Sequence, residues 1–189
     1  YLIPTSMGAE LSSTDAVLEV QDGTMYQPTN FPSATTDIYL DEGTPTVSQD
    51  TNGLMIGNSS IVGTNLSTTT AVVSFDLSSI ALPSVYEVLS ADLTLTAVSG
   101  SGTVEISASR MLTNWDESAT WNDSTSGTSW NNSGALRGSD SDLPDSLVSV
   151  TSVGEHTWNV TRIMQLSIEA GSQQISILLQ PEIFNSPGG

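Results

Sequence analysis

The sequence predicts an all-β fold, an antiparallel β-sandwich or barrel with one short helix. Short apolar runs are separated by clusters of Gly, Ser, Asn and Pro, which is the pattern of short strands joined by turns. Several of these runs alternate apolar and polar residues with the period of a half-buried strand. The abundant Thr and Ser also favour strands over helices, because Thr is β-branched and Ser competes for helical backbone hydrogen bonds.

The expected strands follow one another along the whole chain. They span residues 16–20, 37–40, 54–56, 71–75, 88–97, 104–110, 156–159 and 174–179. The clearest alternation directs Leu93 and Leu95 toward a core, whereas Thr94 faces solvent. The Ser-Gly-Ser-Gly segment at residues 99–102 predicts a hairpin between two of these strands.

Two segments have the character of helices. Residues 76–80 predict a single turn with Asp76 as its N-cap. Residues 161–170 predict a longer helix with a rough apolar face, which Gly171 ends as a C-cap. By contrast, residues 116–146 are rich in Ser, Asn, Asp and Gly, and they predict irregular loops over the surface.

The charge of the chain limits its partners. The 189 residues include 21 acidic residues and only three basic ones, which gives a formal net charge of −18. Such a charge repels nucleic acid and anionic membranes, and suits a saline medium in which salt screens repulsion beyond about 10 Å at 0.1 M. No run approaches the roughly 20 apolar residues of a membrane helix. The lack of cysteine excludes disulfides and thiolate sites.

Six segments occur in the order and with the spacing of a known family. They are residues 36–43 (TDIYLDEG), 54–57 (LMIG), 73–80 (VSFDLSSI), 90–95 (SADLTL), 114–122 (NWDESATWN) and 158–161 (WNVT). Together they resemble the DNRLRE-type β-sandwich family, which includes carbohydrate-binding modules of alginate lyases and other secreted proteins. The resemblance implies a jelly-roll-like sandwich in an extracellular or cell-surface setting. Tyr1 in place of an initial Met also predicts that a leader has been removed.

The resemblance divides the chain into an extension, residues 1–34, and a sandwich, residues 35–189. Members of the family usually close with a strand after the one that matches residues 174–179, but here a tail with prolines and glycines follows, a poor central strand. The extension contains a strand that the family pattern does not require, formed by Ala16, Val17, Leu18, Glu19 and Val20. This strand either completes its own sandwich or is donated to a neighbouring copy.

Two functions follow from these observations. The first is an extracellular structural subunit that assembles head-to-tail with copies of itself into a filament or surface layer, by donor-strand exchange. The second is a carbohydrate-binding module with a glycan partner. An enzyme is not expected, because the chain has neither cysteine nor lysine, and its single imidazole, His156, is predicted to be an ordinary strand residue.

Three tryptophans are candidate sugar-binding residues. Trp130 lies in the irregular region and is predicted to be an exposed platform that stacks on a sugar ring. Trp115 and Trp121 either stack on sugars or close one end of the core, with their N–H groups bonded to the backbone.

Acidic and amide side chains suggest two further kinds of site. Asp140, Asp142 and Asp145 alternate with other residues and form a candidate calcium site, because calcium binds about six to eight oxygen ligands; chance clustering in so acidic a chain is the alternative. Carboxylates also cluster at residues 37–50. Glycosylation sequons occur at Asn58, Asn65, Asn122, Asn131 and Asn159.

Overall fold

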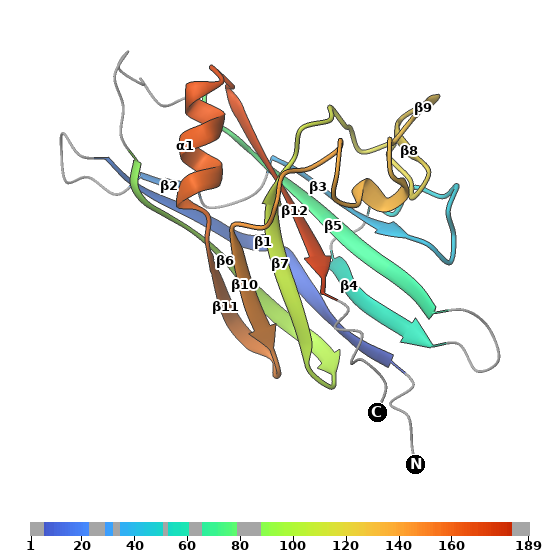
Figure 1. Ribbon diagram of the computed structural model, residues 1–189. Helices are drawn as coiled ribbons and strands as arrows, with labels where there is room; N and C mark the ends of the chain where they lie inside the picture. Colours follow the sequence, from blue (N-terminus) through green and yellow to red (C-terminus); the bar gives the residue numbers. More distant parts are fainter. Residues whose placement is uncertain are drawn as a thin grey trace.

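The computed structural model describes residues 6–22, 29–31, 35–50, 53–60, 66–78 and 88–182, and the structural statements below concern these residues. They form strands, one α-helix and one short 3-10 turn (Figure 1). The strands are β1 (Ser6–Asp22), β2 (Thr29–Phe31), β3 (Thr36–Asp41), β4 (Gly53–Ser60), β5 (Leu66–Asp76), β6 (Val88–Ser101), β7 (Val104–Arg110), β8 (Asp123–Thr125), β9 (Thr128–Ser129), β10 (Ser146–Val150), β11 (Gly154–Asn159) and β12 (Gln174–Pro181). The helix is α1 (Thr161–Glu169), and the 3-10 turn is η1 (Ser133–Ala135).

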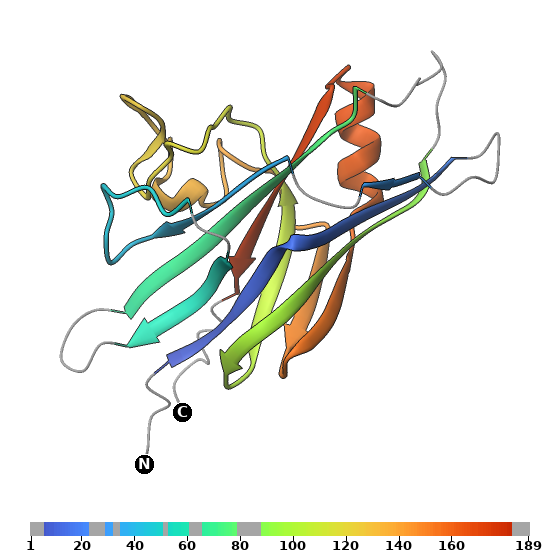
Figure 2. The same cartoon turned by 180° about the vertical axis from the view of Figure 1, so that it is seen from behind.

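The strands form a sandwich of two layers, and every ladder is antiparallel. One layer contains β10, β7, β12, β5 and β3, and the other contains β11, β6, β1 and β4 (Figures 1 and 2). The long strand β5 links the layers, because its residues 71–76 pair with β12 and its residues 66–69 pair with β4. The predicted all-β antiparallel sandwich is therefore confirmed.

The main core lies between the two layers. Alternating apolar side chains from both inner faces meet there, and Phe75 and Ile177 are fully buried. The predicted alternation of β6 is confirmed, since Leu93 is buried whereas Thr94 is partly exposed. The buried Trp158 of β11 joins the layers, because its indole Nε1 donates a hydrogen bond to the Ile106 carbonyl of β7 at 2.8 Å.

Helix α1 lies at one end of the sandwich (Figure 1). Ile163 and Met164 point into the main core. Gly171 ends the helix with a φ of 70°, and its N–H bonds to the Ile168 carbonyl at 2.8 Å, which confirms the predicted cap. Of the other predicted turn only residues 76–78 are described, where the Asp76 carboxylate accepts a hydrogen bond from the N–H of Ser78 at 2.7 Å. No helix in the described part of the chain has the length and apolar character needed to cross a membrane.

The predicted hairpin at residues 99–102 is wrong. Strand β6 pairs with β1 and β11, whereas β7 pairs with β10 and β12, so the two consecutive strands lie in opposite layers. The turn crosses the edge of the sandwich, and Gly102 has a φ of 73° that suits glycine. A hairpin and such a crossover have the same local sequence pattern, because in either arrangement each of the two strands directs one apolar face toward the core.

The prediction that residues 116–146 are irregular is confirmed, but they do more than loop over the surface. Most of this region, with the residues just before it, forms a third layer that covers the outer face of β3, β5 and β12; we call residues 111–145 the loop layer. A second apolar core lies beneath it. Its buried members are Ile38, Leu40, Val72, Met111, Ala119, Trp121, Trp130, Ala135 and Leu178. Strand β5 is consequently buried on both faces, as the 0% exposure of Ala71, Val72 and Val73 shows.

The structure joins the two predicted parts of the chain into one sheet. Strand β1, from the predicted extension, lies between β4 and β6 and pairs with both (Figure 2). Of the two alternatives for this strand, the structure of the single chain shows the one in which the strand completes its own sandwich.

Candidate functional site

The position of β1 is the first candidate functional site, and we call it the β1 slot. Residues 6–12 pair with β4 from Ser59 to Gly53, while residues 8–22 pair with β6. The strand has register shifts, one of them between Ser12 and Val17. The slot is therefore bounded by the edges of β4 and β6, and a single strand placed in it pairs with both edges.

The predicted donor residues occupy only part of this slot. Val17, Leu18, Glu19 and Val20 pair with β6, and the last three also pair with β2; Ala16 lies within the register shift before them. The segment between β4 and β6 is residues 6–12, which sequence reasoning missed. The alternation of Met7, Ala9 and Leu11 was the signal that could have found it.

Leu11 shows how the slot connects to the core. It lies opposite Leu54 of β4 and Ala97 of β6, and all three side chains are buried. A strand in this slot thus contributes both main-chain hydrogen bonds and at least one apolar side chain to the interior.

Trp130 does not form an exposed platform, so that prediction is wrong. Its side chain is only 5% exposed, and its Nε1 donates a hydrogen bond to the Thr120 carbonyl at 2.9 Å. Neither face of the indole is available to a sugar, because the ring belongs to the second core. The local irregularity of the chain concealed this role.

Replacing Trp130 with alanine is expected to lower the free energy of unfolding by about 3–5 kcal/mol, because it removes a large buried ring and a buried hydrogen bond. Urea denaturation measures this change. Val153, which is 65% exposed, provides the control, since Val153→Ala should leave the stability within about 0.5 kcal/mol of the original. A Trp130→Ala protein as stable as the control would contradict the second core.

Trp121 is buried as well, which agrees with the structural alternative for this residue. Its ring packs against Gly134 of η1, whose φ is 76°, and a β-carbon at that glycine would overlap the ring. The Gly134 carbonyl accepts a hydrogen bond from Thr70 Oγ1 of β5 at 2.9 Å, which fastens η1 to the sheet. Trp115 alone among the three predicted tryptophans is partly exposed.

Asp140, Asp142 and Asp145 do not form a calcium site, because each has a different partner. Asp142 pairs with Arg110, with 2.8 Å between its Oδ2 and the guanidinium nitrogen. Asp145 accepts a hydrogen bond from the N–H of Ile163 in the first turn of α1 at 3.2 Å. The part of the chain that the structure describes contains no group of three or more acidic or imidazole side chains arranged to hold a metal ion.

Asp140 instead holds the loop layer together. Its buried carboxylate accepts hydrogen bonds from Thr113 Oγ1 at 2.7 Å, from both nitrogens of Asn131 at 2.9 and 3.2 Å, and from the N–H of Asn132 at 2.6 Å. Its carbonyl accepts the N–H of Leu112 at 2.8 Å. Burial acts to raise the pKa of Asp140, but these hydrogen bonds outweigh it and leave the pKa below its ordinary value.

Two of the predicted carboxylates in residues 37–50, those of Asp41 and Glu42, form hydrogen bonds within the local structure. Asp41 accepts hydrogen bonds from the N–H of Gly43 and the hydroxyl of Thr44, both at 2.8 Å. Glu42 accepts the N–H of Thr68 at 2.9 Å. These bonds fix the turn after β3.

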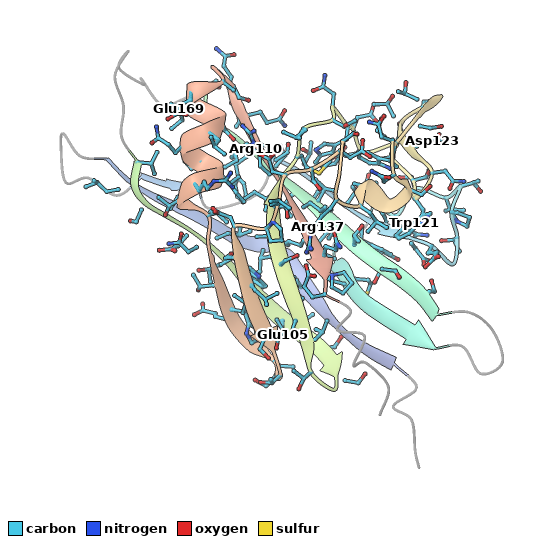
Figure 3. The ribbon with its side chains drawn as sticks, in the orientation of Figure 1. Glu105, Arg110, Trp121, Asp123, Arg137 and Glu169 are labelled. Carbon is cyan, nitrogen blue, oxygen red and sulfur yellow. The ribbon has the colours of Figure 1, made fainter. Side chains whose placement is uncertain are left out.

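A pocket of about 270 Å³ is the second candidate site. It lies where the loop layer meets the end of α1 and the start of β12. Arg110, Asn114, Trp115, Ser172 and Gln174 are among the residues that line it. Figure 3 shows Arg110 in this part of the molecule. An indole beside amide and hydroxyl groups can bind a polar ring, which is the chemistry of sugar recognition.

The remaining predicted residues have mixed surroundings. His156 lies in β11 as expected, and its Nε2 is 2.9 Å from the Ser152 carbonyl. Among the sequons, Asn131 is bonded through its amide nitrogen to Asp140, while Asn159 is exposed and bonded to Asp92 at 3.3 Å. Asn122 is partly buried, the side chain of Asn58 is not described, and Asn65 lies outside the described residues.

Comparison with protein-family models and with curated proteins gave no match to this chain. The resemblance to the DNRLRE-type family therefore stays a prediction.

Proposed function

We propose that this chain is an extracellular structural subunit that assembles head-to-tail with copies of itself, and that β1 is the element exchanged between copies. The observation that carries the proposal is the position of β1. It is the first strand of the sheet in sequence, yet it lies between β4 and β6, whose edges it covers.

Strand exchange fits this arrangement for a physical reason. A copy of β1 from another subunit can make the same ladder bonds and bury the same Leu11 side chain as the chain's own strand. The exchanged and unexchanged forms then differ mainly in the path of the connecting segment. The protein concentration sets the equilibrium between the two forms. When each subunit gives its strand to the next, the contact is heterologous and the assembly grows without closing.

The polar groups of the described residues support a structural role rather than catalysis. The Asp140 carboxylate is surrounded by donors that fix loops, and His156 contacts a carbonyl rather than a nucleophilic side chain. Two of the three arginines are engaged in ion pairs, Arg110 with Asp142 and Arg137 with Glu182. The positive charge that could recognise an anionic substrate is therefore largely neutralised within the fold.

Negative-stain microscopy of the purified protein tests the proposal. Filaments or ordered layers are expected at high protein concentration. Separate single particles at every concentration and salt condition would contradict it.

Salt is expected to favour both folding and assembly, because subunits with a net charge of −18 repel one another. Raising NaCl from 0.1 to 1 M shortens the screening length from about 10 to about 3 Å. Urea midpoints and light scattering, measured across this range, should both increase. A midpoint and a scattering intensity that do not respond to salt would contradict this role of charge.

Carbohydrate binding is the second candidate function, and the pocket beside Trp115 favours it. Trp115→Ala should abolish binding to a glycan array if the pocket holds a sugar, while leaving the far-UV circular dichroism unchanged. The exposed Val153 lies in the turn between β10 and β11, so Val153→Ala is the matched control. Absence of array binding by the unaltered protein would remove this candidate.

A further inference from the structure

Two strand edges lie on the same side of the sandwich. Among the described strands, β10 pairs only with β7 and β11 pairs only with β6, so each ends its layer. The three residues 151–153 connect β10 to β11, which keeps the two edges close (Figure 1). Both edges present backbone N–H and C=O groups that a further strand can bond.

The β10 edge lacks the features that usually prevent such pairing. Proteins protect edge strands with charged residues, proline or bulges. Strand β10 reads Ser-Leu-Val-Ser-Val and has none of these, although the chain contains 21 acidic residues. Leu147 is 47% exposed and lies opposite Ser107 of β7, so the neighbouring strand adds no charge at this position.

We propose that the β10 edge is a docking site for β10 of a second copy, paired antiparallel across a two-fold axis. With Val148 on the axis, Leu147 of one copy lies opposite Ser149 of the other. The same axis brings the two β11 edges toward each other, so both layers can continue across the contact.

A second copy is the occupant that the charge pattern favours. Copies of a strongly anionic chain meet with least repulsion where their surfaces carry no charge. On the outer face beside β10, Ser107 and Ser109 of β7 are buried and uncharged, and Arg137 is paired with Glu182. Two carboxylates lie beside this uncharged strand, the partly exposed Glu105 opposite Ser149 and the exposed Glu155 of β11, so the contact is expected to need high salt. This contact is separate from the exchange of β1, because it uses the two ends of the sheet order, β10 and β11, whereas β1 lies inside the order between β4 and β6.

The test uses a chain in which β1 cannot be exchanged. Glu19 and Asp92 are opposite each other in the β1–β6 ladder, so Glu19→Cys with Asp92→Cys, oxidised at low concentration, locks β1 in its own sandwich. Sedimentation equilibrium in 1 M NaCl then reports the association of the locked chain. A dimer is expected, and hydrogen exchange at residues 146–150 should slow as the dimer forms. A locked chain that stays monomeric at every concentration would overturn the proposal.

Leu147→Lys tests the edge itself, and Val153→Lys is the control with the same change of charge. Lysine lowers the net negative charge, so a pure charge effect would strengthen dimerisation in both variants. Leu147→Lys is expected to weaken the dimer about tenfold through two symmetric cross-strand pairs, while Val153→Lys does not weaken it. Equal dimerisation of both folded variants would show that β10 is not the contact. In the chain without the lock, dimers that never form filaments would contradict the exchange of β1 but not the β10 contact.

Discussion

Removal of residues 1–22 is expected to abolish cooperative unfolding of the isolated chain. The deletion takes β1 from between β4 and β6, so both ladders are lost and Leu54 and Ala97 lose the buried Leu11 between them. The loss exceeds that of any single core substitution, which costs about 2–5 kcal/mol. Circular dichroism during urea denaturation measures it.

A peptide of residues 6–22 should restore the fold of the truncated chain. The peptide can form the same main-chain hydrogen bonds as the connected strand, as in other cases of strand addition. The same peptide with Leu11→Asp is the control, and it should not restore folding, because it places an unpaired carboxylate in the core. A truncated chain that unfolds cooperatively without any peptide would show that the β1 slot need not be filled.

Asp140→Asn is expected to lower the free energy of unfolding by about 2–3 kcal/mol, because it replaces one acceptor oxygen with an amide that faces N–H donors. Guanidinium denaturation at pH 7 measures the change. Asp142→Asn is a close control, since it removes the same charge two residues away. Its partly exposed pair with Arg110 should contribute at most about 1 kcal/mol. Equal losses in the two variants would contradict the role assigned to Asp140.

The contribution of the Asp140 carboxylate to the free energy of unfolding should also depend on pH. Its pKa in the folded protein lies below that of an unfolded aspartate, about 3.9. The stabilisation by the carboxylate is therefore present above about pH 4 and is lost as the pH falls through the lower folded pKa. The difference in stability between the original protein and Asp140→Asn should shrink on acidification, as denaturation curves from pH 7 to pH 3 would show.

The sequence predicted the elements whose signals are local. Alternation in β6 placed Leu93 and Leu95 correctly, and Gly171 marked the end of α1. The short strand β10 was missed, because five residues with two serines give a weak pattern.

The parts that sequence could not predict depend on long-range contacts. Nothing near Trp130 in the chain shows that the loop layer covers β5, because the hydrogen bond that fastens it joins Thr70 to Gly134, 64 residues apart. Asp140 depends in part on such a contact, because one of its donors is Thr113, 27 residues away, while the others, Asn131 and Asn132, are nine and eight residues away. An alternating run of acids resembles a calcium loop until its separate partners are known. The hairpin at residues 99–102 was predicted wrongly because two strands that follow one another in the sequence can either pair in one sheet or face each other across a core.

The central proposal is that β1 passes from one subunit to the next, and an engineered disulfide tests it most directly. The chain has no cysteine, so Glu19→Cys with Asp92→Cys creates a single possible pair, here oxidised after assembly. Thr94→Cys with Thr157→Cys is the control within one chain, because these hydroxyls are 2.9 Å apart in neighbouring strands β6 and β11. Strand exchange predicts a ladder of covalent multimers on a denaturing gel for the first pair and monomers for the control. Monomers for both pairs, from samples that contain filaments, would contradict exchange of β1.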